Sequence, residues 1–169
     1  MSQSMTAEQA HIRHQLQPGD IGGLIRMHGE LYAREQGWDW TFEAYAAQTF
    51  GRLAERWDPA HDRIWIAERA GAIVGSIAIL EVEERIAQLR WFLVHPSARG
   101  SGLGRRLMAD AIEFCRSAGF THVFLWTTAS LTAAARLYRS FGFELTHQET
   151  TERWGAVLTE ERYDLDITR

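Results

Sequence analysis

The stretch "VHPSARGSGLGRRLMADAIEFC", Val94–Cys115, decides how this chain folds, because three different local signals meet in it. Pro96 ends an apolar run, and a helical repeat of apolar residues begins a few positions later. Between them glycine occupies three alternate positions, Gly100, Gly102 and Gly104. Each glycine costs roughly 0.5–1 kcal/mol relative to alanine inside regular structure, so three of them indicate a turn that something approaches closely.

That turn leads into a helix, whose N-terminus carries unpaired N–H groups and a partial positive charge that suit a phosphate. Arg99, Arg105 and Arg106 flank the glycines and add cationic donors. The alternative interpretation is a strand-to-helix turn that needs glycine only for its dihedral angles. The spacing is G-x-G-x-G, which matches neither the P-loop, G-x-x-x-x-G-K-[ST], nor the dinucleotide fingerprint, G-x-G-x-x-G.

Length and composition limit the classes of protein to which this chain can belong. With 169 residues and 46% hydrophobic content, we expect one domain over 11–169, preceded by a flexible N-terminus at 1–10. The net charge of −4 argues against a nucleic-acid partner, and neither a membrane span nor a signal peptide is evident. The single cysteine, Cys115, predicts a cytoplasmic protein and a buried thiol, and the scattered histidines predict no metal site.

Hydrophobic periodicity predicts seven strands and four helices. The strands are expected at 11–17, 63–69, 72–83, 86–95, 122–127, 143–149 and 161–167, and the helices at 21–36, 42–58, 103–118 and 131–141. Hairpins in the middle of the chain favour antiparallel pairing, whereas the strand-helix-strand segment from 86 to 127 requires a parallel pair. The predicted fold class is therefore α/β (α+β), a mixed sheet with helices on its faces.

Two motifs resemble the GNAT superfamily of N-acetyltransferases. R-x-x-G-x-G, Arg99 to Gly104, follows a strand ending "FLVHP" and is similar to that family's acetyl-CoA-binding motif. Further on, "AAARLYRSFGFE" is similar to the family signature A-x-x-L-Y-x-x-x-G-F. The two motifs are specific in combination, and the element order resembles the family over nearly the whole chain. More narrowly, "RMHGELYAREQGWDWTFEA" and the C-terminal half resemble the acetyltransferase half of MarR–acetyltransferase fusion proteins, without their DNA-binding half.

The resemblance implies a GNAT-like fold, with a mixed, mostly antiparallel central sheet of about seven strands flanked by about four helices. It also implies acetyl-CoA as the cosubstrate, without a metal, held where the fourth and fifth strands splay apart. The residues implied for acetyl-CoA binding are Phe92, Leu93, Val94, Arg99, Gly100, Ser101, Gly102, Leu103, Gly104 and Arg105. One position departs from the family: many members carry Asn where this chain has Leu131.

Tyr138 falls where many family members place a tyrosine beside the thioester sulfur, which implies the role of general acid. A phenol with an ordinary pKa near 10 stays protonated at pH 7 and is able to give its proton to a departing thiolate. The alternative is a tyrosine that packs its ring under the sheet. A backbone N–H of Leu93 or Val94 is the expected donor to the negative charge that develops on the thioester oxygen.

The attacking amine must also lose a proton. The acidic residues nearest the sheet in this part of the sequence are Glu81, Glu83 and Glu84, which precede the fourth strand. Each is either the general base or a solvated charge of a turn. Some members of the family work without a dedicated base, so a third alternative is that none exists.

In the resembled family the first two helices form the wall for the acetyl acceptor. Here the expected substrate-binding residues are His28, Tyr32, Glu35, Trp38 and Trp40. Aromatic faces and carboxylates together suit a cationic amine. The alternative is that the aromatic rings fill a core while the acids face water. Seven tryptophans likewise either support a homodimer or belong to the core.

These observations lead to two hypotheses of function. The first is an acetyltransferase that moves an acetyl group from acetyl-CoA to a primary amine of a small molecule or a lysine side chain, by direct attack on the thioester. The second is a non-catalytic acyl-CoA-binding sensor or interaction domain that kept the glycine loop. Tyr138 favours the enzyme, whereas Leu131 and the unassigned base leave room for the sensor.

Overall fold

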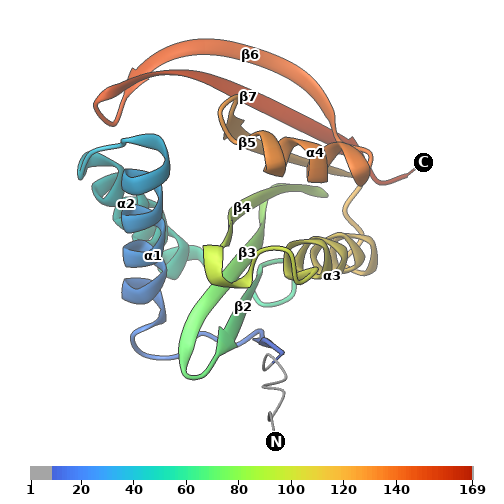
Figure 1. The fold of residues 1–169 in the computed structure, drawn as a ribbon. Helices are drawn as coiled ribbons and strands as arrows, with labels where there is room; N and C mark the ends of the chain where they lie inside the picture. Colours follow the sequence, from blue (N-terminus) through green and yellow to red (C-terminus); the bar gives the residue numbers. More distant parts are fainter. Residues whose placement is uncertain (1–8, 169) are drawn as a thin grey trace, which may run out of the picture.

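A seven-stranded sheet organises residues 9–168, the part of the chain that the computed structural model describes (Figure 1). Its strands lie in the order β1-β2-β3-β4-β5-β7-β6. Their bounds are β1 (His11–Arg13), β2 (Arg63–Arg69), β3 (Ala72–Glu83), β4 (Ile86–Val94), β5 (His122–Thr128), β6 (Glu144–Arg153) and β7 (Ala156–Asp166). Only β4 and β5 pair in parallel, and the other neighbours are antiparallel. The predicted mixed, mostly antiparallel α+β fold is confirmed.

Helices cover both faces of this sheet. They are α1 (Asp20–Gln36), α2 (Thr41–Arg56), α3 (Leu103–Ser117) and α4 (Thr132–Ser140), with a short 3-10 turn at Pro96–Ala98. α1 and α2 pack against one face, while α3 and α4 pack on the other (Figure 1). The predicted order of elements is confirmed, since each expected strand and helix occurs in its expected place.

Some element boundaries differ from the prediction. β1 ends at Arg13, the last residue that pairs with β2, and the guanidinium of Arg13 pairs with Asp20 and Glu68. The final hairpin is much longer than expected, because β6 is a largely exposed edge strand whose polar sequence hides its pairing with β7. In Figure 1 this hairpin arches across to the side of the sheet that carries α2. Residues 1–8 of the predicted flexible N-terminus lie outside the described residues.

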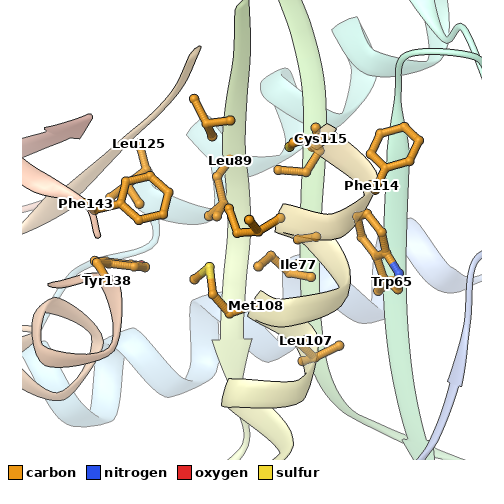
Figure 2. Packing of buried hydrophobic residues seen from close by; sticks show 14 of the residues in the cluster. Trp65, Ile77, Leu89, Leu107, Met108, Phe114, Cys115, Leu125, Tyr138 and Phe143 are labelled. Carbon is orange, nitrogen blue, oxygen red and sulfur yellow. The ribbon is translucent and has the colours of Figure 1, made fainter. Parts of the chain in front are cut away.

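Two clusters of buried residues form the core, one on each face of the sheet. Figure 2 shows the cluster under α3 and α4, where Met108, Leu125, Tyr138 and Phe143 pack together. Cys115 belongs to the same cluster and is fully buried, and burial raises the pKa of its thiol to about 12. The prediction that this cysteine lies in the core is therefore confirmed.

β4 parts from β5 soon after it begins. The two strands pair only at Ile86, Ala87 and Gln88, so the backbone of β4 beyond Gln88 has no strand partner on that side. A β-bulge follows at Trp91, which has a φ of 47° and whose carbonyl accepts a hydrogen bond from the Ser76 hydroxyl at 2.6 Å. A bulge lets two consecutive side chains share one face of a sheet. Arg90 and Trp91 accordingly both turn toward α2.

Candidate active site

A cavity of about 660 Å³ opens where β4 and β5 separate. Its walls come from α1 and α2 on one side and from the glycine loop, the first turn of α3 and α4 on the other. The tip of the β6–β7 hairpin supplies a further wall through Trp154. The cavity thus joins the two regions that the sequence predicts for acetyl-CoA and for the acceptor.

Most of the predicted site residues line this cavity. They are His28, Tyr32, Glu35, Trp38, Phe92, Leu93, Val94, Arg99, Gly100, Gly102, Leu103, Gly104, Arg105 and Tyr138. Ser101 does not line it, because its hydroxyl turns back to donate to the Ala98 carbonyl at 2.6 Å. Trp40 does not line it either, since it directly precedes α2 with its side chain 75% exposed.

The three glutamates considered as the base lie elsewhere. Glu81, Glu83 and Glu84 surround a separate hollow beside Arg56. They come just before β4, whereas the glycine loop follows the end of that nine-residue strand. None of the three lines the cavity on which Tyr138 opens, so the structure gives no support to a general base among them, and that role stays a prediction.

The three glycines of the loop do not all adopt the same backbone conformation. Gly100 and Gly102 have φ values of 75° and 82°, which L side chains rarely adopt, so the turn itself needs glycine there. Gly104 lies in the helix, where an added Cβ would only touch Phe92 and Val94 at 3.5 Å. Dihedral angles therefore require glycine at the first two positions and not at Gly104.

The same loop leaves its amides free. Within residues 9–168, no hydrogen-bond acceptor is found for the backbone N–H groups from Gly100 to Arg105. The space where a Cβ of Gly100 or Gly102 would stand is open. Free donors around open space at the N-terminus of α3 fit a pyrophosphate.

The arginines beside the loop differ in their partners. Arg99 forms a two-pronged ion pair with Glu35 of α1, with N–O distances of 2.8 and 3.1 Å. Both side chains are partly exposed, and such pairs contribute only about 0–1 kcal/mol to stability. Arg105 instead donates to the Ser140 hydroxyl at 3.1 Å and lies over the Phe141 ring. Among the described residues it has no carboxylate partner.

Tyr138 is both a core residue and a cavity residue. It is 4% exposed, and its ring lies about 6 Å from those of Phe92, Phe143 and Tyr163. Burial, followed by the nearby Tyr32 and Tyr163, raises the pKa of its phenol well above the usual 10, while a hydrogen bond with Thr127 acts in the opposite direction. The phenol therefore keeps its proton at neutral and alkaline pH, as a general acid requires.

His28 is a buried polar group in the wall of the cavity, with 3% exposure. Its Nδ1 lies 2.8 Å from the Leu24 carbonyl, so this nitrogen carries the proton and donates. Its Nε2 lies near the Trp91 backbone, without a hydrogen bond of normal geometry. Burial lowers the pKa of the imidazole to about 4, so the ring is neutral at pH 7.

This histidine predicts a pH dependence of stability. As pH falls, the unfolded chain takes up the proton near 6.5, whereas the folded chain does so only near 4. Stability is therefore full above pH 6.5, and about 3 kcal/mol is lost by pH 4. We expect His28→Leu to flatten the free energy of unfolding over this window, measured by urea titration. An exposed control, His11→Leu, should keep the wild-type slope, and an unchanged slope in His28→Leu would contradict the assignment.

An aromatic wall closes the acceptor side of the cavity. It consists of Tyr32, Trp38, Phe42, Tyr45 and Trp154, whose neighbouring rings lie 4.6–6.1 Å apart. The hairpin reaches these helices through a hydrogen bond of 2.9 Å from the Asp39 amide to the Trp154 carbonyl. Both interpretations of the aromatic residues hold in part, because Trp38 and Phe42 are buried in the core and also line the cavity.

Among the cavity residues that sequence reasoning missed, three depend on tertiary structure. Trp154 comes from the hairpin, and Glu160 of β7 reaches the cavity because β7 lies beside β5, with Thr128 opposite it. Arg90 of β4 lines the cavity from the strand face opposite Leu89 and reaches Tyr45 of α2. Of these three residues only Trp154 had a signal in the sequence, because a tryptophan stands just before Gly155 in the turn between the last two strands.

The described residues contain no helix that is long and apolar enough to cross a membrane. Residues 9–168 also contain no group of three or more His, Cys, Asp or Glu side chains arranged to hold a metal ion.

A family model for acetyltransferases of the GNAT family matches residues 27–143, more than half of the chain. A mycothiol acetyltransferase from Thermomonospora curvata is 37% identical over 75% of this chain and 42% of its own length. The rat N-acetyltransferase family 8 member 3 is 38% identical over 48% of this chain and 38% of its own length. The chain thus spans less than half the length of these two curated relatives.

Solved structures share the fold. The yncA protein of Salmonella typhimurium, whose structure includes its cofactor acetyl-CoA, matches with a TM-score of 0.71 and 19% identity, over 95% of each chain. The fold, the cavity between the splayed strands and the family match together define the class of this protein. The chain belongs to the GNAT family of acetyltransferases, and that family uses acetyl-CoA.

Proposed function

We propose that this protein transfers the acetyl group of acetyl-CoA to a primary amine of a small molecule or of a lysine side chain. One observation carries the proposal: the free amides of the glycine loop and the buried phenol of Tyr138 open on the same cavity. The first suits the pyrophosphate, and the second suits the leaving sulfur.

In the proposed reaction acetyl-CoA supplies an activated acetyl group and leaves as a thiol. The amides from Gly100 to Arg105, with the guanidinium of Arg105, hold the pyrophosphate. Phe92, Leu93 and Val94 present the unpaired edge of β4 to the pantetheine arm, and an amide of Leu93 or Val94 donates to the thioester oxygen. Tyr138 holds a proton on its phenol oxygen and gives it to the departing sulfur as the new N–C bond replaces the C–S bond.

We propose that the amine loses its proton to water rather than to a dedicated glutamate. The two carboxylates that line the cavity, Glu35 and Glu160, are each ion-paired, the first with Arg99 and the second with Arg153. A carboxylate held by a guanidinium is a weak base.

The second candidate function is an acyl-CoA sensor without turnover. Leu131 favours it, because this apolar side chain lines the cavity where many relatives carry an asparagine. The two candidates differ in whether the thiol of CoA is released.

The test is release of free CoA thiol from acetyl-CoA with a panel of acceptors: polyamines, amino acids, aromatic amines and lysine peptides. Amine-dependent release is the expected result. If acetyl-CoA raises the melting temperature while none of these amines stimulates release, the sensor is supported. A protein that shows neither effect would contradict both candidates.

Four narrower proposals accompany this function. We propose that residues 11–169 form one acetyltransferase domain, that it is related to the acetyltransferase half of MarR fusion proteins, and that it works in the cytoplasm. The lone buried Cys115 supports the cytoplasmic location.

The fourth proposal is a homodimer, in which the exposed Trp40 and Trp126 are candidate contacts. Light scattering would test it.

A further inference from the structure

The acceptor side of the cavity holds an uncompensated positive charge beside Tyr45. Arg90 donates to the Tyr45 hydroxyl at 3.0 Å, and Arg153 lies over the Tyr45 ring at 5.0 Å. Glu160 pairs with Arg153 at 2.9 Å. Within residues 9–168 Arg90 forms no ion pair with any carboxylate. Of the two guanidinium groups beside Tyr45, only that of Arg153 is paired with a carboxylate.

The surroundings of Arg90 make its positive charge unfavourable without a counterion. Its side chain is half-buried and lines the cavity, and its other close contact is the Trp91 ring at 5.1 Å. A guanidinium has five N–H donors, of which Tyr45 takes one. A partly desolvated charge without a counterion costs free energy, which an anionic group on a ligand would recover.

Strand alternation explains why the charge lies there. Neighbouring side chains of a strand point to opposite faces, and Leu89 packs under α3 and α4, so Arg90 faces α2 and reaches Tyr45. The bulge brings Trp91 to the same face, where it stacks on Phe50 of α2 at 3.9 Å. The free donors of Arg90 are thereby held beside the aromatic wall.

We propose that Arg90 binds a carboxylate of the acetyl acceptor, and that the acceptor is a small α-amino acid with an apolar or aromatic side chain. Guanidinium and carboxylate match in a two-pronged geometry, and the rings of Trp38, Phe42 and Trp154 offer the apolar part a surface. An amine without an acid group would leave the charge of Arg90 without a counterion. The inference rests on the acetyl transfer proposed above.

The first test measures binding without turnover. Calorimetry would compare N-acetylphenylalanine with N-acetylphenethylamine, which lacks the carboxylate, and repeat the pair for leucine and methionine. We expect the wild type to bind the acids about tenfold more tightly, because a charged hydrogen-bond pair is then made. Arg90→Gln should abolish that preference, and Arg90→Lys should restore part of it.

The matched control is Arg52→Gln, which removes the same charge from an exposed position of α2 outside the cavity and should leave the preference intact. Equal affinity for acid and amine, a preference that survives Arg90→Gln, or no binding by any of the acids would each overturn the proposal.

The second test separates this inference from the proposed function. Thiol release would be followed with phenylalanine and with phenethylamine. Release that is equal for both and unaffected by Arg90→Gln would uphold acetyl transfer and overturn the carboxylate site. No release with any amine would contradict acetyl transfer, and the binding comparison would still decide the role of Arg90.

Discussion

Replacing Tyr138 by phenylalanine should lower kcat by about a hundredfold or more, because proton transfer by a positioned side chain contributes roughly 10²–10⁴-fold. The change removes one hydroxyl and keeps the ring that packs against Phe92 and Phe143. Acetyl-CoA affinity and melting temperature should therefore stay close to those of the wild type. Steady-state kinetics and calorimetry with acetyl-CoA measure the two effects separately.

The matched control is Tyr163→Phe. Tyr163 is a fully buried neighbour of Tyr138, and its hydroxyl bonds with Arg139 and Glu161 rather than lining the cavity. This variant should lose stability and keep kcat. Equal kcat in Tyr138→Phe and the wild type would remove the general-acid role.

A pH profile adds an independent check on Tyr138. Since burial raises the pKa of this phenol above 10, its proton stays in place throughout the alkaline range in which enzymes are usually assayed. We expect kcat to stay level or to rise up to pH 9 as more of the amine becomes neutral. A fall in kcat near pH 8 that Tyr138→Phe abolishes would show a lowered pKa instead.

The second large effect is expected from Gly102→Val, which should weaken acetyl-CoA binding by about a hundredfold or more. A Cβ at this position would stand in the open space beside the unpaired loop amides, and several charged hydrogen bonds to the pyrophosphate would be lost together. Valine at a φ of 82° also strains the backbone by at least about 1–2 kcal/mol.

Strain and lost binding can be separated, because α3 is followed by a second glycine of the same kind. Gly119 has a φ of 81°, also has open space around its missing Cβ, and lies outside the cavity. Gly119→Val should cost a similar free energy of unfolding while leaving acetyl-CoA affinity unchanged. Chemical denaturation and calorimetry on both variants give the comparison. Loss of affinity in both, or in neither, would sink the glycine-loop assignment.

Much of the fold could be predicted because its signals are local. The strands at 63–69 and 72–83 are observed with the predicted bounds, since alternating and β-branched residues flank a turn at Ala70 and Gly71. α1 ends before Gly37, whose φ of 70° closes the helix. These features depend on neighbours a few positions apart, which a sequence displays directly.

The part of the site nearest the proposed reaction was predictable for the same reason. The glycine loop and Tyr138 belong to short motifs, each read from fewer than about a dozen residues. Their meeting in one cavity required only that α3 and α4 follow two neighbouring parallel strands.

The acceptor side was decided by tertiary structure. The sequence by itself determined the order of elements, the turn at Gly100 and Gly102 and the candidate phenol of Tyr138. The strand order β5-β7 brought Glu160 into the cavity, whereas Glu81, near the end of β3, lines the separate hollow beside Arg56. Contacts across a sheet join residues that are far apart in the chain, and no local periodicity encodes which strands become neighbours.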